Sequence, residues 1–266
     1  MQSATNRRLG IIGYGRIGSF LYDAIVNDRE LGIDIAFVYD VDKARLQALP
    51  EEVILGDIKD FPQTKPDLIV EAAHPNAVRE YAEFILKHTD LMIMSVTALA
   101  DVELQELIKK TCLEHGTTLF IPHGAIVGLD ALIEGREIWE EVSITMKKNP
   151  KNLNFECAGI QAESITEPTV LYDGPVRKVC DLFPKNVNSH ATVGLAALGL
   201  DRTRSILIAD PKLEVSIVEV DAKGSGVEIH VTRQNPITGV TGKLTLLSVL
   251  ESVKRILGKR QWIQFV

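Results

Sequence analysis

Apolar and polar positions alternate in blocks along the first half of the chain. Short apolar runs recur between Leu9 and Phe120, and the segments between them, such as 77–88 and 101–116, repeat apolar residues at helical spacing. Strand and helix signals in regular alternation are typical of a parallel sheet covered by helices. Ligands bind beyond the carboxyl ends of such strands, so the loops there are expected to line one crevice. These loops begin at Gly13, His74, Ser95 and His123.

The pattern changes after about residue 125. Four β-rich runs follow, and two segments of helical character, "PVRKVCDLFP" and "SHATVGLAALGL", lie between them. This mixture predicts an α+β substrate domain built on a largely antiparallel sheet. We therefore expect the α/β class, with a doubly wound parallel sheet of the Rossmann type over 1–125 and the second domain over 126–241. The amphipathic C-terminal helix, 242–258, is expected to pack back on the first domain.

The stretch "LGIIGYGRIGSF" places three glycines between the first predicted strand and the first helix. In a dinucleotide site, Gly13 would make the tight turn, Gly15 would let backbone N–H groups approach a pyrophosphate, and Gly18 would let the helix pack on the strand. An ordinary strand-to-helix turn is the alternative. The residues of this turn predicted to bind the cofactor are Gly13, Tyr14, Gly15, Arg16, Ile17 and Gly18.

An acidic residue strengthens the dinucleotide interpretation. Asp40 ends the second apolar run about twenty residues after the last glycine, where a carboxylate can accept hydrogen bonds from a ribose diol. Asp40 would also repel a 2′-phosphate, which favours NAD over NADP, although Lys43 and Arg45 lie close enough to soften that preference. His74 and Ser95, at the ends of later strands, complete the cofactor residues predicted in this half of the chain.

Composition narrows the function classes. The 266 residues carry a net charge of −7, which argues against a nucleic-acid binder. Three cysteines without a CxxC pair indicate neither a disulfide framework nor a cysteine-based zinc site, and we expect no metal. With no apolar run of membrane length and no room for a secretory leader, a cytoplasmic protein is expected. An exposed apolar sheet face in the second domain would favour a homodimer.

Several motifs together resemble the L-aspartate dehydrogenases, including the animal proteins of that type. The resemblance covers nearly the whole chain and rests on "GIIGYGRIG", "VYDVD", "VEAAHPNAVREYAEFIL", "MSVTALAD", "PHGAIVGLDAL", "LYDGPVRKVCDLFPKNVN" and "ADP" at 209–211. It implies a Rossmann domain joined to a dihydrodipicolinate-reductase-like domain, NAD or NADP as oxidant, conversion of aspartate to iminoaspartate, and a place in NAD biosynthesis. It also implies that Ala125 and Asn188 contact the nicotinamide end of the cofactor.

The chain departs from that family at one position. The bacterial enzymes of that family carry a histidine shortly after the "ADP" segment, and this chain has Ser216 at the matching place and no histidine between 191 and 229. Oxidation of an amine requires loss of a proton from nitrogen, so a replacement base is expected. His190 is the preferred candidate, because a position at a helix start would lower its pKa and keep it neutral. His123 is the next candidate, and Lys185 is considered for a substrate carboxylate.

Three functions remain open at this point. The first is an NAD(P)-dependent amino-acid dehydrogenase that acts on aspartate. The second is a dehydrogenase or reductase of another small carboxylate, and the third is a non-catalytic NAD(P)-binding protein that has lost its chemistry at Ser216.

Overall fold

The computed structural model describes residues 6–124, 126–236, 242–259 and 262–263. The chain divides into two compact units. Unit 1 consists of Met1–Met94, Glu106–Pro122 and Leu246–Val266, and unit 2 consists of Ser95–Gln105 and His123–Thr245. The chain therefore leaves unit 1 after its fourth strand and returns to it twice.

Unit 1 is built on a five-stranded parallel sheet in the order β2-β1-β3-β4-β5. Apolar residues dominate these strands, and most of those in β1 to β4 are buried, as expected for strands that are covered on both faces. Their bounds are β1 Arg7–Ile12, β2 Ile33–Tyr39, β3 Leu68–Glu71, β4 Asp90–Ile93 and β5 Leu119–Phe120.

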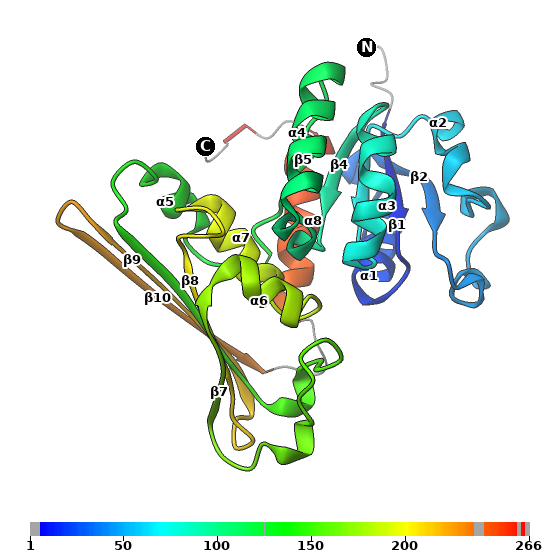
Figure 1. The fold of residues 1–266 in the computed structure, drawn as a ribbon. Helices are drawn as coiled ribbons and strands as arrows, with labels where there is room; N and C mark the ends of the chain where they lie inside the picture. The colour runs from blue at the N-terminus through cyan, green and yellow to red at the C-terminus, as the bar shows by residue number, and fades with distance from the viewer. Residues whose placement is uncertain (1–5, 125, 237–241, 260–261, 264–266) are drawn as a thin grey trace. The chain divides into compact units, whose positions relative to one another are not determined.

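Helices cover both faces of this sheet (Figure 1). Helices α1 (Arg16–Asn27) and α8 (Lys243–Leu257) share one apolar core with β1 to β4, to which α8 contributes Val249, Val253 and Leu257. Helices α3 (Pro75–Leu86) and α4 (Val102–His115) lie on the opposite face. The C-terminal helix thus supplies three fully or almost fully buried side chains to the core of unit 1.

Unit 2 is built on a mixed five-stranded sheet in the order β10-β9-β6-β8-β7. Only β6 and β8 run parallel, and the other neighbours are antiparallel. Along β6 and β9 every second residue is buried, so one face of the sheet is covered and the other is more open. The bounds are β6 Glu141–Lys148, β7 Thr169–Pro175, β8 Arg204–Ala209, β9 Val215–Gly224 and β10 Val227–Pro236.

Three helices, α5 (Leu129–Glu134), α6 (Val176–Leu182) and α7 (Asn188–Ala196), cover the buried face of the unit 2 sheet (Figure 1). The remaining helical segments are the short helix α2 (Phe61–Thr64) and single turns of 3-10 helix. These turns are Arg29–Leu31, Lys43–Leu46, Glu51–Val53, Ile58–Asp60, Val96–Ala100, Pro150–Asn152 and Ala162–Ser164.

The units differ from the expected domains by a few residues at the boundaries, and most clearly at one internal segment. Residues 95–105 lie within the stretch expected to form the first domain, whereas the structure groups Ser95–Gln105 with unit 2. Hydrogen bonds explain this: the Thr97 backbone N–H donates to Asn188 Oδ1 at 3.1 Å, and Arg177 Nη1 donates to the Ala100 carbonyl at 2.6 Å. These bonds link positions 77 and 91 residues apart, so sequence periodicity carries no sign of them.

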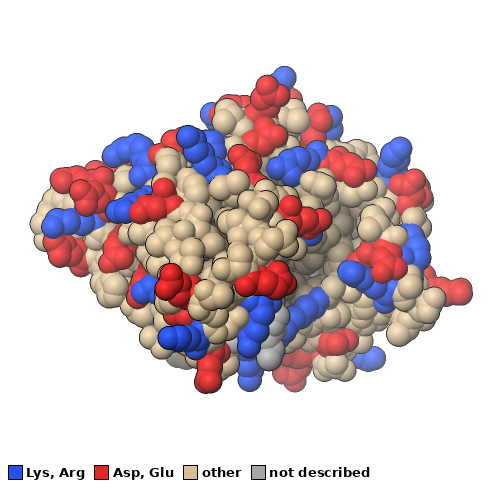
Figure 2. All heavy atoms as spheres, turned by 60° about the horizontal axis from the view of Figure 1, so that its bottom comes forward, with Lys and Arg blue, Asp and Glu red and all other residues tan. Residues whose placement is uncertain are grey.

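Charged side chains of both signs are interspersed over the face drawn in Figure 2. None of the helices formed by the described residues combines the length and the hydropathy that a membrane crossing requires. Within the same residues, no group of three or more His, Cys, Asp or Glu side chains is placed to hold a metal ion.

Candidate functional site

The glycine-rich turn of unit 1 leaves room for a ligand at only one of its glycines. Gly13 has a φ of 93°, and a Cβ there would stand 2.8 Å from the Ala72 backbone, so only glycine fits. At Gly18 a Cβ would stand 1.9 Å from the Gly13 carbonyl oxygen. A Cβ on Gly15 would meet nothing closer than an Arg45 nitrogen at 3.8 Å. The turn therefore presents an open backbone surface at Gly15, at the start of α1, where a pyrophosphate fits.

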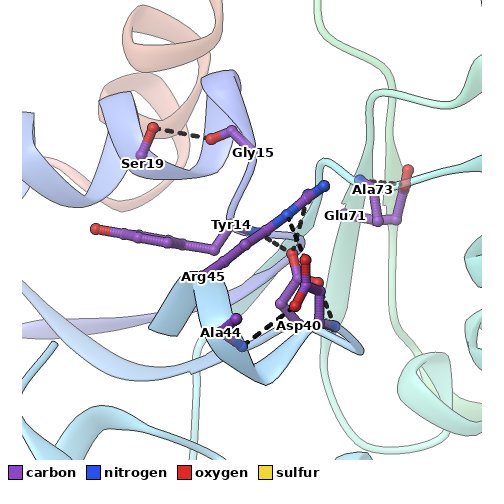
Figure 3. Close-up of polar contacts among 9 residues, drawn as sticks. Tyr14, Gly15, Ser19, Asp40, Ala44, Arg45, Glu71 and Ala73 are labelled. Atoms are coloured by element: carbon purple, nitrogen blue, oxygen red, sulfur yellow. Dashed lines mark hydrogen bonds and ion pairs between the residues drawn. The ribbon is translucent and has the colours of Figure 1, made fainter. Parts of the chain in front are cut away.

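Asp40 holds this turn in place (Figure 3). Its carboxylate accepts hydrogen bonds from the backbone N–H groups of Tyr14, at 2.7 Å, and Asp42, at 2.8 Å. The half-exposed Arg45 lies 3.7 Å from the same carboxylate. Asp40 is 6% exposed and follows the last residue of β2 directly, which is the position of the ribose-binding acid in dinucleotide folds.

A cavity of about 260 Å³ opens beside Asp40. Tyr39 and Tyr81 form one wall, with their rings edge to face and 6.3 Å between centroids. His74 also lines the cavity and caps α3, because its Nδ1 accepts from the Asn76 backbone N–H at 3.2 Å. An apolar, aromatic-walled space next to the ribose acid suits an adenine ring. The residues of unit 1 thus fit the adenosine and pyrophosphate of NAD.

One buried acid that supports this region was missed by sequence reasoning. Glu71, the last residue of β3, is 1% exposed and accepts a hydrogen bond from the Ala73 backbone N–H at 2.8 Å (Figure 3). It shapes the loop that closes over Gly13. The residue lies in the segment "VEAAHP". Nothing in that pattern distinguishes a buried acid that hydrogen-bonds the following loop from an ordinary exposed acid at the end of a strand.

Asn188, at the start of α7, is held in one orientation. Its Oδ1 accepts from both the backbone N–H and the hydroxyl of Thr97, at 3.1 and 3.2 Å, which leaves Nδ2 to donate elsewhere. Thr97 is 2% exposed and was not singled out in the sequence. Ser95 precedes it and is almost fully buried. Ala125, the other residue expected at the nicotinamide, lies outside the described residues.

His190 is the most enclosed titratable group of the site. It is fully buried, and its Nδ1 lies 2.7 Å from Ser205 Oγ, while its buried Nε2 has no hydrogen-bond partner among the described residues. Burial, followed by the charge of Lys148, lowers the pKa of His190 to about 3. The ring is therefore neutral at pH 7, as expected, but burial and Lys148 are the causes rather than the helix start.

Lys148, a cation that the sequence did not indicate, lies near His190. Lys148 ends β6 and is 5% exposed, and burial together with the charge of Arg233 on β10 lowers its pKa to about 8. Ser216 on β9 is 1% exposed, and its hydroxyl has no hydrogen-bond partner among the residues that the structure describes. Ser216, where the resemblance led us to expect a histidine, thus faces the same covered side of the sheet as Lys148.

The other candidates lie elsewhere. Lys185, considered for a substrate carboxylate, pairs with Glu156 at 2.8 Å, and both side chains are exposed. His230 is on the open side of the unit 2 sheet, where its Nδ1 lies 2.6 Å from Asp221. His123 is half-buried in the loop that leads into unit 2.

Two family models match the chain. Residues 13–122 match the model described as "Homoserine dehydrogenase, NAD binding domain", and residues 130–256 match "Aspartate dehydrogenase, C-terminal". An "Aspartate dehydrogenase domain-containing protein" of Xenopus tropicalis is 33% identical over 95% of this chain and 95% of its own length. The chain belongs to the aspartate dehydrogenase family. An "L-aspartate dehydrogenase" of Nitrosopumilus maritimus is 31% identical over 94% of this chain and 96% of its own.

A solved structure gives the same assignment. The aspartate dehydrogenase from Thermotoga maritima superimposes with a TM-score of 0.77 and 27% identity, over 98% of this chain and 100% of its own. These findings confirm the expected family, the α/β fold class and the NAD cofactor. By family, the chain is an NAD(P)-dependent oxidoreductase. The individual cofactor-binding and catalytic residues stay predictions.

Proposed function

We propose that this chain oxidises L-aspartate to iminoaspartate, with NAD as the hydride acceptor. The observation that carries the proposal is that the part of the chain matching the aspartate dehydrogenase C-terminal model has an interior suited to a small anionic amino acid. There, a neutral histidine and an unpartnered hydroxyl lie on the same side of the sheet as a buried lysine. Buried polar groups without hydrogen-bond partners destabilise a fold, and a bound ligand can complete their hydrogen bonds.

Most of the proposed cofactor contacts come from unit 1. When bound, NAD supplies an electrophilic nicotinamide ring that takes up a hydride. The backbone at Gly15 would meet the pyrophosphate, and Asp40 would accept from the ribose hydroxyls through lone pairs that Tyr14 and Asp42 leave open. Asn188, which Thr97 orients with Nδ2 as its available donor, would hold the carboxamide oxygen.

The proton balance assigns a role to His190. Aspartate loses the hydride from its α-carbon and a proton from its nitrogen, and the nitrogen–carbon bond becomes double. If Nδ1–H donates to Ser205, Nε2 carries a free lone pair in a dry environment and can accept that hydrogen. A bound carboxylate would offset the charge of Lys148. This would raise the pKa of His190 and make the ring a better proton acceptor.

The proposal includes the location and the oligomeric state of the enzyme. We expect a cytoplasmic enzyme, and we expect a homodimer. Half-buried apolar side chains on the open side of the unit 2 sheet, Ile206, Ile208 and Ile217, support the second expectation. Sedimentation velocity of the full chain tests it, and a single species of monomer mass would contradict it.

The test of the proposed activity follows the absorbance of reduced nicotinamide over a panel of L-amino acids and 2-hydroxy acids with NAD and with NADP. We expect turnover with L-aspartate and the reverse reaction from oxaloacetate and ammonia. Activity on another small carboxylate alone would replace the substrate and keep the reaction class, an outcome that the absent family histidine at Ser216 makes worth testing. NADH binding without turnover of any substrate would contradict the enzymatic proposal.

A further inference from the structure

Six side-chain polar atoms in unit 2 are buried and lack a hydrogen-bond partner among its described residues. The large majority of buried side-chain polar atoms are paired, so each exception calls for an explanation such as a missing ligand. The atoms are Asn186 Nδ2, Ser189 Oγ, His190 Nε2, Thr203 Oγ1, Ser216 Oγ and Arg233 Nε. Within the described residues, unit 1 has none of this kind.

Strand register brings three of the relevant side chains together. Lys147 of β6 pairs with Ile217 of β9, so Lys148, one residue further, lies beside Ser216. Both are buried and lie on the covered face of the sheet. Arg233 of β10 pairs with Val218, which is buried on that same face. Lys148 and Arg233 are close enough for the charge of Arg233 to lower the pKa of Lys148.

Neither cation has an acidic partner among the residues that the structure describes. No ion pair there involves Lys148 or Arg233, and Arg233 Nη1 donates a hydrogen bond to Asn235 Oδ1. A buried cation is destabilising unless an anion compensates its charge, and two adjacent cations repel one another as well. Elsewhere in the unit, Lys147 pairs with Glu219 and Arg204 pairs with Asp173.

The missing partner must therefore carry negative charge and hydrogen-bond acceptors. A carboxylate accepts from a lysine ammonium, an arginine fork and a hydroxyl at once, and two carboxylates match the two positive charges. We propose that Lys148 and Arg233, with the Ser216 hydroxyl, form an anion clamp that selects a small dicarboxylate as the substrate of unit 2. This inference rests on the proposed function and names the residues that give it its substrate class.

The clamp would also place a substrate near the neutral His190. Lys148 acts on His190 from the same interior, so a dianion held by Lys148 is brought close to the unpartnered Nε2. His190 Nε2 can then accept from the ammonium of an amino dicarboxylate. The arrangement provides acceptors for the cationic end of such a substrate and donors for its anionic end.

The test uses Lys148→Met and Arg233→Met, which keep most of the side-chain length and remove the charge. Lys147→Met is the matched control, because Lys147 is the next residue on β6, points to the open face and pairs with Glu219 at 2.9 Å. Binding of succinate, propionate and inorganic phosphate to the NADH-loaded protein is measured by calorimetry. We expect succinate to bind wild type and Lys147→Met, and to bind both clamp variants about ten- to a hundredfold more weakly.

Melting temperature separates a clamp from a structural role. Removing an uncompensated buried charge should leave the ligand-free Lys148→Met protein as stable as wild type or more stable. A lower melting temperature together with unchanged succinate affinity would overturn the clamp. Phosphate that binds more tightly than succinate would also overturn the assignment to a dicarboxylate.

The outcomes distinguish the clamp from the proposed function. Succinate binding that the clamp variants lose, without aspartate turnover, would keep the clamp and reject aspartate as substrate. Aspartate turnover with an unchanged KM in Lys148→Met would keep the proposed function and reject the clamp.

Discussion

The two units of this chain differ in whether their polar binding groups are hydrogen-bonded before a ligand binds. In unit 1 the binding turn is complete without a ligand: Asp40 accepts from Tyr14 and Asp42, and the turn closes around Gly13. In unit 2 the interior leaves His190 and Ser216 with unpartnered atoms beside a buried cation. A cofactor common to many enzymes needs only a rigid backbone surface, whereas a specific small substrate is recognised by groups that stay unsatisfied until it binds.

The largest effect is expected at His190. His190→Ala should lower turnover by roughly two to four orders of magnitude, the usual range for a positioned acid or base, because the proton from the substrate nitrogen loses its acceptor. Affinity for NADH should change little, since the proposed adenosine and pyrophosphate contacts lie in unit 1 and His190 is not among the proposed cofactor contacts. Steady-state kinetics and calorimetric NADH titration measure the two quantities.

His115→Ala is the matched control, because His115 is exposed at the end of α4. Circular dichroism of His190→Ala must show an intact fold, since the ring is fully buried. Wild-type turnover in a folded His190→Ala protein would assign the proton to another group, with His123 next.

The protonation of Lys148 predicts a pH dependence of dicarboxylate binding. Its pKa is about 8 in the ligand-free protein because of burial and Arg233, and the neighbouring His190 is neutral throughout. A bound carboxylate favours the charged lysine, so succinate affinity should be full below about pH 8 and should fall by about tenfold per pH unit above it. Calorimetry from pH 6.5 to 9.5 tests this slope, and the slope should vanish in Lys148→Met. Equal succinate affinity across that range in the wild-type protein would show that Lys148 does not bind the ligand.

Two glycines of unit 1 should respond differently to the same substitution. Gly15→Ala places a methyl in open space, so the melting temperature should stay unchanged while NADH affinity falls on the order of tenfold, because the methyl occupies the approach of the pyrophosphate. Gly18→Ala should lower the melting temperature, since its Cβ would stand 1.9 Å from the Gly13 carbonyl oxygen. Unchanged NADH affinity in Gly15→Ala would show that the pyrophosphate does not bind at this turn.

The smallest effect is expected at Arg45. Its guanidinium is half exposed and lies 3.7 Å from Asp40, where it can approach a 2′-phosphate. Arg45→Met should weaken NADPH several-fold and change NADH little, because exposed charge contacts are weak. Comparative titration of the two cofactors decides it. A loss of NADH affinity as large as that of NADPH would show that Arg45 supports the turn rather than the phosphate.

The sequence predicts the candidate site of unit 1 better than that of unit 2, for a physical reason. The turn at Gly13 and the acid at Asp40 are separated by one helix and one strand, so their spacing is visible in the sequence. Lys148, Ser216 and Arg233 come from three strands that meet only through sheet register, and each looks like an ordinary strand residue by itself. Strand β7 was not predicted either, because its seven residues end in "DGP" and pair only at one edge of the sheet.

The same limit explains the two lysines. Lys185 was considered for the substrate because it lies in the family segment "LFPKNVN", yet it is paired at the surface with Glu156. Lys148 ends the unremarkable run "VSITMKK", and only its burial next to Arg233 marks it.

The central claim, that unit 2 selects a substrate by its second negative charge, is tested most directly by comparing L-aspartate with L-asparagine. The two differ by one charge at almost equal size. We predict that wild type has a much higher kcat/KM with NAD for aspartate than for asparagine, that Lys147→Met keeps this ratio, and that Lys148→Met loses most of it. Equal kcat/KM values for the two amino acids in the wild-type protein would contradict the account.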